Sequence, residues 1–424
     1  MEITMLATME PHVILSHKLI LPADRSERLH YIKHQFPLAK GVSLSKQWVG
    51  GRHAAIKQLN QVDGIAYNRN RNFLNGAVTH LSPYLRHGCI TLKEAFDHIQ
   101  ARYGITAEKL IFELAWRDYW RQVWYMQGNK ILSDMETSKV LLGAKPLPDF
   151  VKKAQTGLPC MDAFIHDLID DGYVHNHARM WFAAYVLHWL KVDWRAAADW
   201  YESYLLDGDL SSNHLSWQWI ATTNSSKPYY FNKENLARFT GEKYCTGCTA
   251  KCPFDKSYED LQAQLFDTNH QAVANVYPIV ATPKQALSGL STVAIYVHDE
   301  MLSPAHPLMQ QPFPKIFVFD NMLHGHWSIN RLQFMADCLS EMPEVEVWMG
   351  DTRQVLQERG VGQVITQNTP NSAIKALLQP FSPKWQAEEA FVNLKLDEKN
   401  LRRFSKYWEK VGPVLLGDKE YRKP

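Results

Sequence analysis

The chain has 424 residues, of which 46% are hydrophobic and 21% charged, and its formal net charge is +2. This length predicts two domains, and this composition is typical of a soluble globular protein. There is no run of about 20 apolar residues, and the N-terminus lacks a basic region followed by an apolar run, so we expect a cytoplasmic protein that does not enter membranes. The small net charge does not exclude nucleic acid, because a groove binder needs only a local basic patch.

Residues 45–206 have the sequence pattern of helices. Apolar and aromatic side chains recur at helical spacing, as Met180, Ala184 and Leu187 do, and turn signals are sparse. We therefore predict a mainly helical first domain and assign it to residues 1–260.

Residues 207–219, DGDLSSNHLSWQW, combine two carboxylates, an amide and two indoles in thirteen residues. A helix end with a turn at Asp207, Gly208 and Asp209 and two core tryptophans would explain the run equally well when it is taken alone. A site for a buried, redox-active ring needs the same mixture of side chains. The neighbouring runs decide between these interpretations.

Three of the six cysteines stand close together in the sequence. Cys245, Cys248 and Cys252 form C-x2-C-x3-C before Pro253, and Cys160 lies in TGLPC. Four thiolates suit a [4Fe-4S] cluster or zinc, and thiols without a metal are the third interpretation. We expect the other two cysteines, Cys89 and Cys338, to be core residues.

The last third of the chain has a different pattern. Short β-branched runs at 292–298, 315–320, 345–350 and 362–366 alternate with segments that open with Ser or Asp caps. This alternation predicts a parallel, doubly wound sheet, although the first strand–helix turn lacks the GxGxxG fingerprint of a dinucleotide site.

The predicted fold class is therefore α + α/β, an all-helical domain followed by a Rossmann-like parallel α/β domain. A polar, Gln- and Ala-rich stretch predicts the linker between them. The expected division is a helical domain at 1–260, a linker at 261–290, the α/β domain at 291–395 and a C-terminal helical segment at 396–424.

Four runs together resemble the FAD-binding domain of the photolyase/cryptochrome family, in the same order and with similar spacing, over roughly residues 48–230. They are LSPYLRHG at 81–88, FELAWRDYWR at 112–121, the helical run at 156–206 and DGDLSSNHLSWQW at 207–219. The α/β domain normally comes first in this family, so the resemblance implies a circular permutation, with RRFSKYWEKV near the end similar to the segment that leads into the helical domain. The competing interpretation is an unrelated Rossmann-like appendage.

The resemblance implies noncovalently bound FAD, and a helix cap or surface ion pair is the alternative for each residue alone. The hydroxyls and backbone N–H groups around Thr79 would bind phosphate, Arg179 and Asp207 would pair beneath the ring, and Asn213 would face the ring nitrogen N5. The positions that match cofactor-binding residues of the family are Tyr67, Thr79, Leu81, Ser82, Arg117, Asn176, Arg179, Asp207, Asp209 and Asn213. The sequence does not identify an antenna chromophore.

The implied activity is that of a deoxyribodipyrimidine photo-lyase, a DNA-repair flavoprotein that flips a UV-induced pyrimidine dimer out of the DNA and splits it under blue light. The implied partner is UV-damaged DNA, single- or double-stranded, and we expect a monomer. By resemblance, two residues would bind the bases through hydrogen bonds, one would lie against the dimer and two indoles would form apolar walls. In that order these residues are Glu113 and Asn176, Met180, and Trp116 and Trp219.

The lesion type follows less directly from the resemblance. His177 stands where cyclobutane-dimer enzymes commonly carry Arg, and only part of the His-His pair of (6-4) enzymes is present, since Asn176 follows His175. We favour the cyclobutane dimer, with the (6-4) photoproduct possible. A cryptochrome-like blue-light photoreceptor without repair activity is the alternative function.

Two further features follow from the resemblance. Trp217 and Trp194 match the first two members of the family's electron-transfer tryptophans, but the outer one is absent, and Trp181, Tyr185 or Trp189 could replace it.

The cysteine pattern resembles the iron-sulfur bacterial branch of the family, with a shorter last loop. That branch implies a [4Fe-4S] cluster held by four cysteines. The cysteines are Cys160, Cys245, Cys248 and Cys252.

Overall fold

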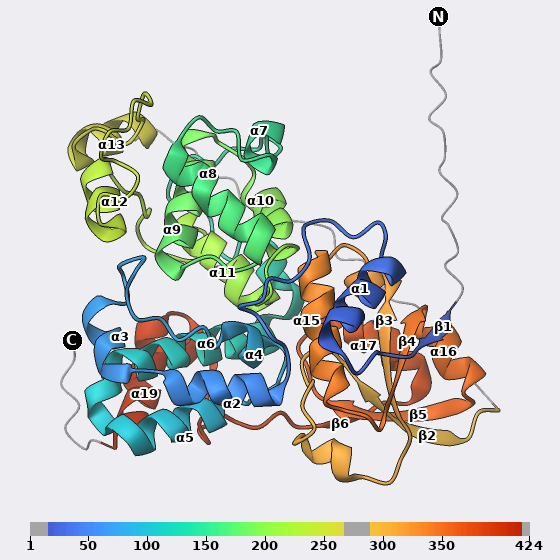
Figure 1. Cartoon of the computed structure of the whole chain (residues 1–424). Helices are drawn as coiled ribbons and strands as arrows, with labels where there is room; N and C mark the ends of the chain where they lie inside the picture. Colours follow the sequence, from blue (N-terminus) through green and yellow to red (C-terminus); the bar gives the residue numbers. More distant parts are fainter. Residues whose placement is uncertain (1–15, 267–288, 418–424) are drawn as a thin grey trace, which may run out of the picture.

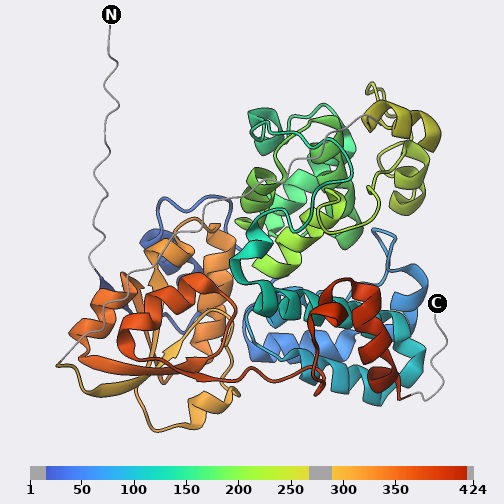
Figure 2. The same ribbon diagram turned by 180° about the vertical axis from the view of Figure 1, so that it is seen from behind.

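The computed structural model describes residues 16–266 and 289–417. Within these ranges the chain forms a helical part and an α/β part that lie side by side (Figure 1, Figure 2). None of the described helices is both long and apolar enough to cross a membrane. Most of the predicted linker, residues 267–288, lies outside the described residues.

The helical part has two lobes, with α2 to α6 in one and α7 to α13 in the other (Figure 1). Side-chain caps begin several helices where the sequence supplies them; Thr91, Asp193 and Asp209 each accept a backbone N–H bond at the start of α5, α10 and α11. The helices are α2 (Arg52–Gln61), α3 (Gly64–Asn70), α4 (Ser82–Arg86), α5 (Leu92–Tyr103), α6 (Glu108–Gln127), α7 (Asp149–Lys152), α8 (Pro159–His166), α9 (Asn176–Ala184), α10 (Trp194–Glu202), α11 (Leu210–Ile220), α12 (Lys233–Thr240) and α13 (Tyr258–Leu265).

The α/β part contains a six-stranded sheet in the order β1-β4-β3-β2-β5-β6. Neighbouring strands from β4 to β6 are parallel, and β1 pairs antiparallel with β4 at the edge. The predicted parallel, doubly wound sheet is confirmed, and two short strands, β1 and β6, were not predicted. The strands are β1 (His17–Leu19), β2 (Thr292–Val297), β3 (Lys315–Asp320), β4 (Val345–Gly350), β5 (Val361–Gln367) and β6 (Lys384–Gln386).

Helices cover both faces of this sheet. Alternate residues of β3 enter different cores: Phe317 and Phe319 belong to the large core shared with the helical part, whereas Ile316 and Val318 belong to a smaller core. Helix α1 from the N-terminal region packs on α15. The helices of this part are α1 (Arg25–Gln35), α14 (Asn321–His324), α15 (Ile329–Ser340), α16 (Thr352–Glu358) and α17 (Ser372–Leu378).

The C-terminal segment returns to the helical part. Helices α18 (Glu398–Leu401) and α19 (Phe404–Leu416) both pack on α6. The large core therefore extends from one face of the sheet through α15 to α5, α6 and α19. The two parts share this core, which fixes the helical part against the sheet.

Candidate functional site

The turn between α10 and α11 brings two of the predicted carboxylates together with arginines. Arg179 Nη2 donates to Asp207 Oδ2 at 2.9 Å, and Arg117 Nη2 lies 3.7 Å from Asp209 Oδ2. Asp209 Oδ1 also accepts the backbone N–H of Ser212 at 2.8 Å, which caps α11. The two carboxylates are 7% and 5% exposed, so each one depends on its protein partners for solvation.

The charges in this turn persist at neutral pH. Burial opposes the charge on Asp209, but Arg117 and its neighbour Arg86 outweigh burial and hold the pKa of Asp209 below its usual range. Burial also opposes the charge on Arg179, but Asp207 raises the pKa of Arg179 above its usual range. The turn therefore holds the ionised carboxylate of Asp209 and the charged guanidinium of Arg179.

The predicted phosphate-binding segment lies at the start of α4. Thr79 Oγ1 accepts the backbone N–H of Leu81 at 3.3 Å, and the Thr79 carbonyl accepts a hydrogen bond from Gln58 at 2.9 Å. Ser82 is the first residue of α4, which has only five residues. This segment can therefore bind an anion through hydroxyls and local N–H groups, and not through the dipole of a long helix.

Two other predicted cofactor residues lie on helices that both contact α6. Tyr67 of α3 is largely desolvated, and burial raises its pKa above its usual range. Asn213 of α11 donates from Nδ2 to the carbonyl of Ala198 at 3.0 Å. This bond fixes the orientation of the Asn213 amide.

The predicted lesion residues fall on two groups of helices. Glu113 and Trp116 lie on α6, whereas Asn176 and Met180 lie on α9 and Trp219 lies on α11. Helix α11 contacts both α6 and α9. In Figure 1, α6 lies in one lobe, and α9 and α11 lie in the other. The predicted residues therefore come from both lobes.

The side chains on α6 already have protein partners. Glu113 pairs with Arg71 at 2.8 Å. Burial raises the pKa of Glu113, against the influence of Arg71. Trp116 stacks on Phe404 of α19, with ring centroids 3.7 Å apart and an interplanar angle of 6°. One face of this indole is thus covered by the protein itself.

The histidines beside Asn176 are neutral at physiological pH. Burial lowers the pKa of His175 to about 4 and also lowers the pKa of His177. The His177 ring stacks on Trp181 at 4.1 Å. At the position where cyclobutane-dimer enzymes commonly carry Arg, this chain therefore holds an uncharged ring.

The predicted electron-transfer tryptophans are both buried, at 4% and 1% exposure for Trp217 and Trp194. The Trp217 ring packs against Tyr201 at 5.8 Å and Phe182 at 6.2 Å. Tyr201 in turn lies 6.4 Å from Trp200. The sequence reasoning missed Tyr201 and Trp200, although the run DWYESY at 199–204 carries both.

The three suggested replacements for the outer tryptophan are core residues. Trp181 and Tyr185 are buried, and Trp189 lies 5.1 Å from Phe254 of the same core. The geometry thus gives each of them a packing role.

The four cysteines predicted to bind a metal lie in one region. Cys160 is buried, and its thiol interacts electrostatically with those of Cys252 and Cys245. However, residues 16–266 and 289–417 contain no group of three or more Cys, His, Asp or Glu side chains arranged to hold a metal ion. The thiols therefore do not form a metal site in this arrangement. Cys248 is exposed, and the other two loop thiols, Cys245 and Cys252, are half-buried.

Cys89 and Cys338 are buried core residues, as predicted, and their Sγ atoms are 3.5 Å apart.

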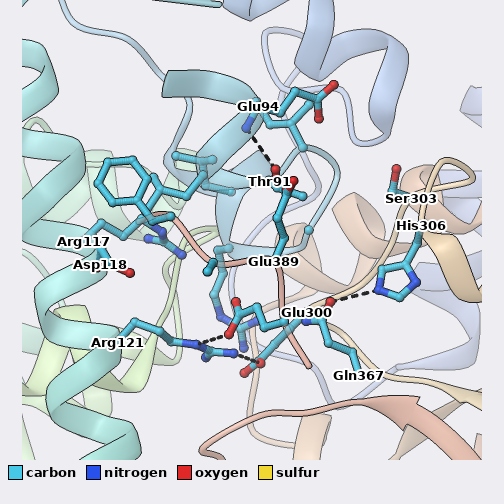
Figure 3. Close-up of a pocket in the computed structure, with 18 of the residues that line it drawn as sticks. Thr91, Glu94, Arg117, Asp118, Arg121, Glu300, Ser303, His306, Gln367 and Glu389 are labelled. Atoms are coloured by element: carbon cyan, nitrogen blue, oxygen red, sulfur yellow. Dashed lines mark hydrogen bonds and ion pairs between the residues drawn. The ribbon is translucent and has the colours of Figure 1, made fainter. Parts of the chain in front are cut away.

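A cavity of about 870 Å³ lies between the helical part and the carboxyl ends of β2, β5 and β6 (Figure 3). Arg121 of α6 spans it, with bonds to Glu300 at 2.7 Å and Glu388 at 3.0 Å. His306 Nε2 lies 2.9 Å from Gln367 Oε1 on the opposite wall. The predicted cofactor residues Arg117 and Asp209 also line the cavity.

The position of this cavity follows from the strand order. From β2 the chain adds β3 and then β4 on one side of the sheet. It then crosses to the other side of β2 and adds β5 and β6, so the direction of strand addition reverses between β2 and β5. Ligands of open α/β sheets bind at such a reversal. The sequence did not reveal the cavity, because its lining residues come from segments as far apart as Arg52 and Phe391.

The α10–α11 turn, with its buried carboxylates and their arginine partners, lies within a stretch of the chain that resembles a known domain. Residues 110–245 match the family model described as the FAD binding domain of DNA photolyase. Over this region the chain is similar to members of the photolyase/cryptochrome family.

Curated relatives include both kinds of family member. The deoxyribodipyrimidine photo-lyase of Alkalihalophilus pseudofirmus is 32% identical over 204 residues, which cover 46% of this chain and 42% of that protein. Cryptochrome DASH of Danio rerio is 32% identical over 166 residues, 37% of this chain and 32% of that protein. The chain thus spans less than half the length of the curated relatives it matches.

Among solved structures, a bacterial class III photolyase from Agrobacterium tumefaciens aligns with a TM-score of 0.39 and 23% identity. The alignment covers 45% of this chain and 43% of that one.

Proposed function

We propose that the chain is a light-dependent DNA repair enzyme that binds FAD in its helical part and splits UV-induced pyrimidine dimers, with the cyclobutane dimer favoured. The observation that carries this proposal is the α10–α11 turn, where the buried pair Arg179–Asp207 stands beside the capping carboxylate Asp209. Reduced FAD, when bound, supplies the photoexcited electron that breaks the dimer bonds. UV-damaged DNA is the proposed partner, and we propose that the protein acts as a cytoplasmic monomer.

The residues around the turn suit reduced FAD. Asn213 uses its amide nitrogen to bind Ala198, so its Oδ1 is the atom suited to accept a hydrogen bond from protonated N5. Arg179 and Arg117 bring positive charge beside a ring that becomes anionic on reduction. Thr79, Leu81 and Ser82 offer hydroxyl and N–H groups to the pyrophosphate.

The lesion would be held between the two lobes. Met180 and Trp219 are half-buried on the α9–α11 side and offer apolar surface to unstacked bases. Asn176 is exposed at the start of α9 and can donate hydrogen bonds to base edges. On α6, Glu113 would exchange its bond to Arg71 for bonds to the bases, and burial raises the pKa of this carboxyl.

The alternative function is a cryptochrome-like photoreceptor, and one observation favours it. Phe404 occupies one face of Trp116, so only the other face of this indole remains for a base. A smaller lesion pocket would suit a protein in which light changes the binding of a partner and no DNA bond is broken.

The test is a light-dependent repair assay on oligonucleotides that carry one defined cyclobutane dimer or one (6-4) photoproduct. With its flavin fully reduced, the protein should restore the cyclobutane-dimer substrate under blue or near-ultraviolet light.

Replacing Arg179 and Asp207 together by Ala should abolish FAD retention and repair, because the pair lies at the centre of the proposed flavin site. The matched control replaces the peripheral pair Arg359 and Glu346, which are 2.6 Å apart on the sheet part, and should retain both properties. Bound FAD without repair of either lesion would favour the photoreceptor.

The iron-sulfur cluster stays a separate proposal, which the observed arrangement of thiols does not support by itself. Cluster binding would require the thiols of Cys160, Cys245, Cys248 and Cys252 to converge on one point. Iron and acid-labile sulfide analysis after anaerobic purification decides between a cluster, zinc and free thiols.

We also propose the domain division at 1–260, 261–290, 291–395 and 396–424, with β1 and α1 of the first segment joining the α/β part, and a circular permutation relative to the family. Two features support the permutation. The parallel strands follow the order 3-2-1-4-5 of doubly wound nucleotide-binding folds when β2 is counted as strand 1. The helical part also precedes this sheet in the chain.

A further inference from the structure

The carbonyl of Gly208, in the middle of the proposed flavin-binding turn, receives hydrogen bonds from two buried arginines that come from different parts of the chain. Arg86 of α4 donates from Nε at 2.6 Å, and Arg331 of α15 donates from Nη2 at 2.6 Å. Helix α15 belongs to the α/β part and lies at its boundary with the helical part (Figure 1). The α/β part thus reaches the turn directly.

Arg331 is held through both of its terminal nitrogens and by an aromatic ring. It is fully buried, its Nη1 donates to Glu202 Oε1 at 2.8 Å, and its guanidinium lies 3.4 Å from the centre of the Trp327 ring. Glu202 is the last residue of α10, just before the turn. Burial opposes ionisation of Glu202, but the charge of Arg331 outweighs it and holds the pKa of Glu202 below its usual range. Arg331 therefore binds the chain both before the turn and within it.

The packing leaves no room for a side chain at position 208. A Cβ atom on Gly208 would collide with Arg331 Nη1 and would lie 2.7 Å from the carbonyl oxygen of Glu202. Only glycine allows the guanidinium to approach so closely. The position of Gly208, and with it the direction of the neighbouring side chains Asp207 and Asp209, is coupled to the position of Arg331.

We propose that Arg331 is a positioning residue of the flavin site: through the Gly208 carbonyl and Glu202 it sets where Asp207 and Asp209 lie, and so couples the α/β part to the cofactor. This inference rests on the proposed function, because it assumes that FAD binds at this turn. The two bonds of Arg331 diverge from a planar guanidinium, and a lysine ammonium at the end of a flexible chain cannot reproduce both directions.

The test compares full-length Arg331→Met and Arg331→Lys with the wild type. FAD affinity is measured by fluorescence titration, and the reduction potential and visible absorption spectrum of bound FAD are recorded. We expect a loss of FAD affinity of at least tenfold for Arg331→Met and a smaller loss for Arg331→Lys. Both variants should show a shifted reduction potential at FAD saturation, which a merely structural role would not produce. The control variants Arg359→Met and Arg359→Lys, on the outer side of the same part, should match the wild type in all three measurements.

The possible outcomes separate the two proposals. If the wild type binds no FAD, the proposed function fails. If the wild type binds FAD and both Arg331 variants match its affinity, potential and spectrum, the positioning role is wrong. Should Arg331→Met fail to fold, Arg331→Lys decides, because it keeps the buried charge beside Glu202 and Trp327. A folded Arg331→Lys with wild-type potential and affinity overturns the inference.

Discussion

At the scale of single residues, buried histidines make the stability of the protein depend on pH. His188 is 1% exposed, and burial, reinforced by Lys191, lowers its pKa to about 3. In the unfolded chain a histidine has a pKa of about 6.5. Between these two values the unfolded chain binds a proton that the folded chain does not, so acidification favours unfolding. His87 and His324 are also buried, with pKa values lowered to about 3 and about 4.

We predict that His188→Phe weakens this pH dependence. Lowering the pH from 7 to 5 should cost the wild type about 2 kcal/mol through this one histidine, and the variant should be spared that loss. Urea unfolding at the two pH values measures the difference. The exposed residue His30 supplies the control, since His30→Phe should leave the pH dependence as it is in the wild type. If His188→Phe loses as much stability between pH 7 and pH 5 as the wild type does, this side chain already takes up its proton in the folded state.

At the scale of elements, α19 closes the core beneath α6. Phe404 is 6% exposed and contacts Phe112 at 4.9 Å and Trp116 at 3.7 Å, and Tyr407 donates a hydrogen bond to Asp118 at 2.5 Å. The apolar face of α19 is thus buried along its whole length. This helix is a fixed part of the helical core, and it limits the space around Trp116.

We predict that Phe404→Ala destabilises the protein by about 3–5 kcal/mol, because it removes a buried aromatic ring and leaves a cavity. Thermal or urea unfolding measures the loss, and the fluorescence of Trp116 should report its new exposure. Ser405→Ala, at the exposed neighbouring position, should change stability by less than about 0.5 kcal/mol. If the Phe404 variant repairs DNA better than the wild type despite its lower stability, Phe404 restricts the lesion pocket.

Elements with a strong local pattern could be predicted from the sequence, and contacts between remote segments could not. The β3 and β4 strands are six-residue runs bounded by turns, so their pattern alone identifies them. The β1 strand has three residues, His17–Leu19, and forms because the edge of β4 is available to it. The Arg179–Asp207 pair was inferred from a resemblance. By contrast, the contact between Arg331 and Gly208 joins residues 123 positions apart, and no local pattern marks it.

At the scale of the whole molecule, the helical and α/β parts share one core. The large apolar cluster includes Phe334 and Met335 of α15 together with Leu59, Ile99 and Ile111 of the helical part. Buried ion pairs cross the same boundary, among them Arg86–Asp299 at 2.6 Å. Separating the parts would expose apolar surface and leave charges unpaired, so neither part is expected to be stable alone.

We predict that residues 1–266, expressed alone, do not form a stable flavin-binding domain. The piece contains every proposed cofactor residue, but it lacks α15, which supports the α10–α11 turn, and α19, which covers α6. Circular dichroism should show reduced helix content or a broad unfolding transition, and FAD titration should show weak or no binding. Co-expression with residues 289–424 should restore both properties, because the contacts that are lost lie between the two pieces and not in the segment that joins them. A piece of residues 1–266 that unfolds cooperatively and binds FAD as tightly as the full chain would mean that the helical part organises its flavin site without the sheet, and it would contradict the role given to Arg331 as well.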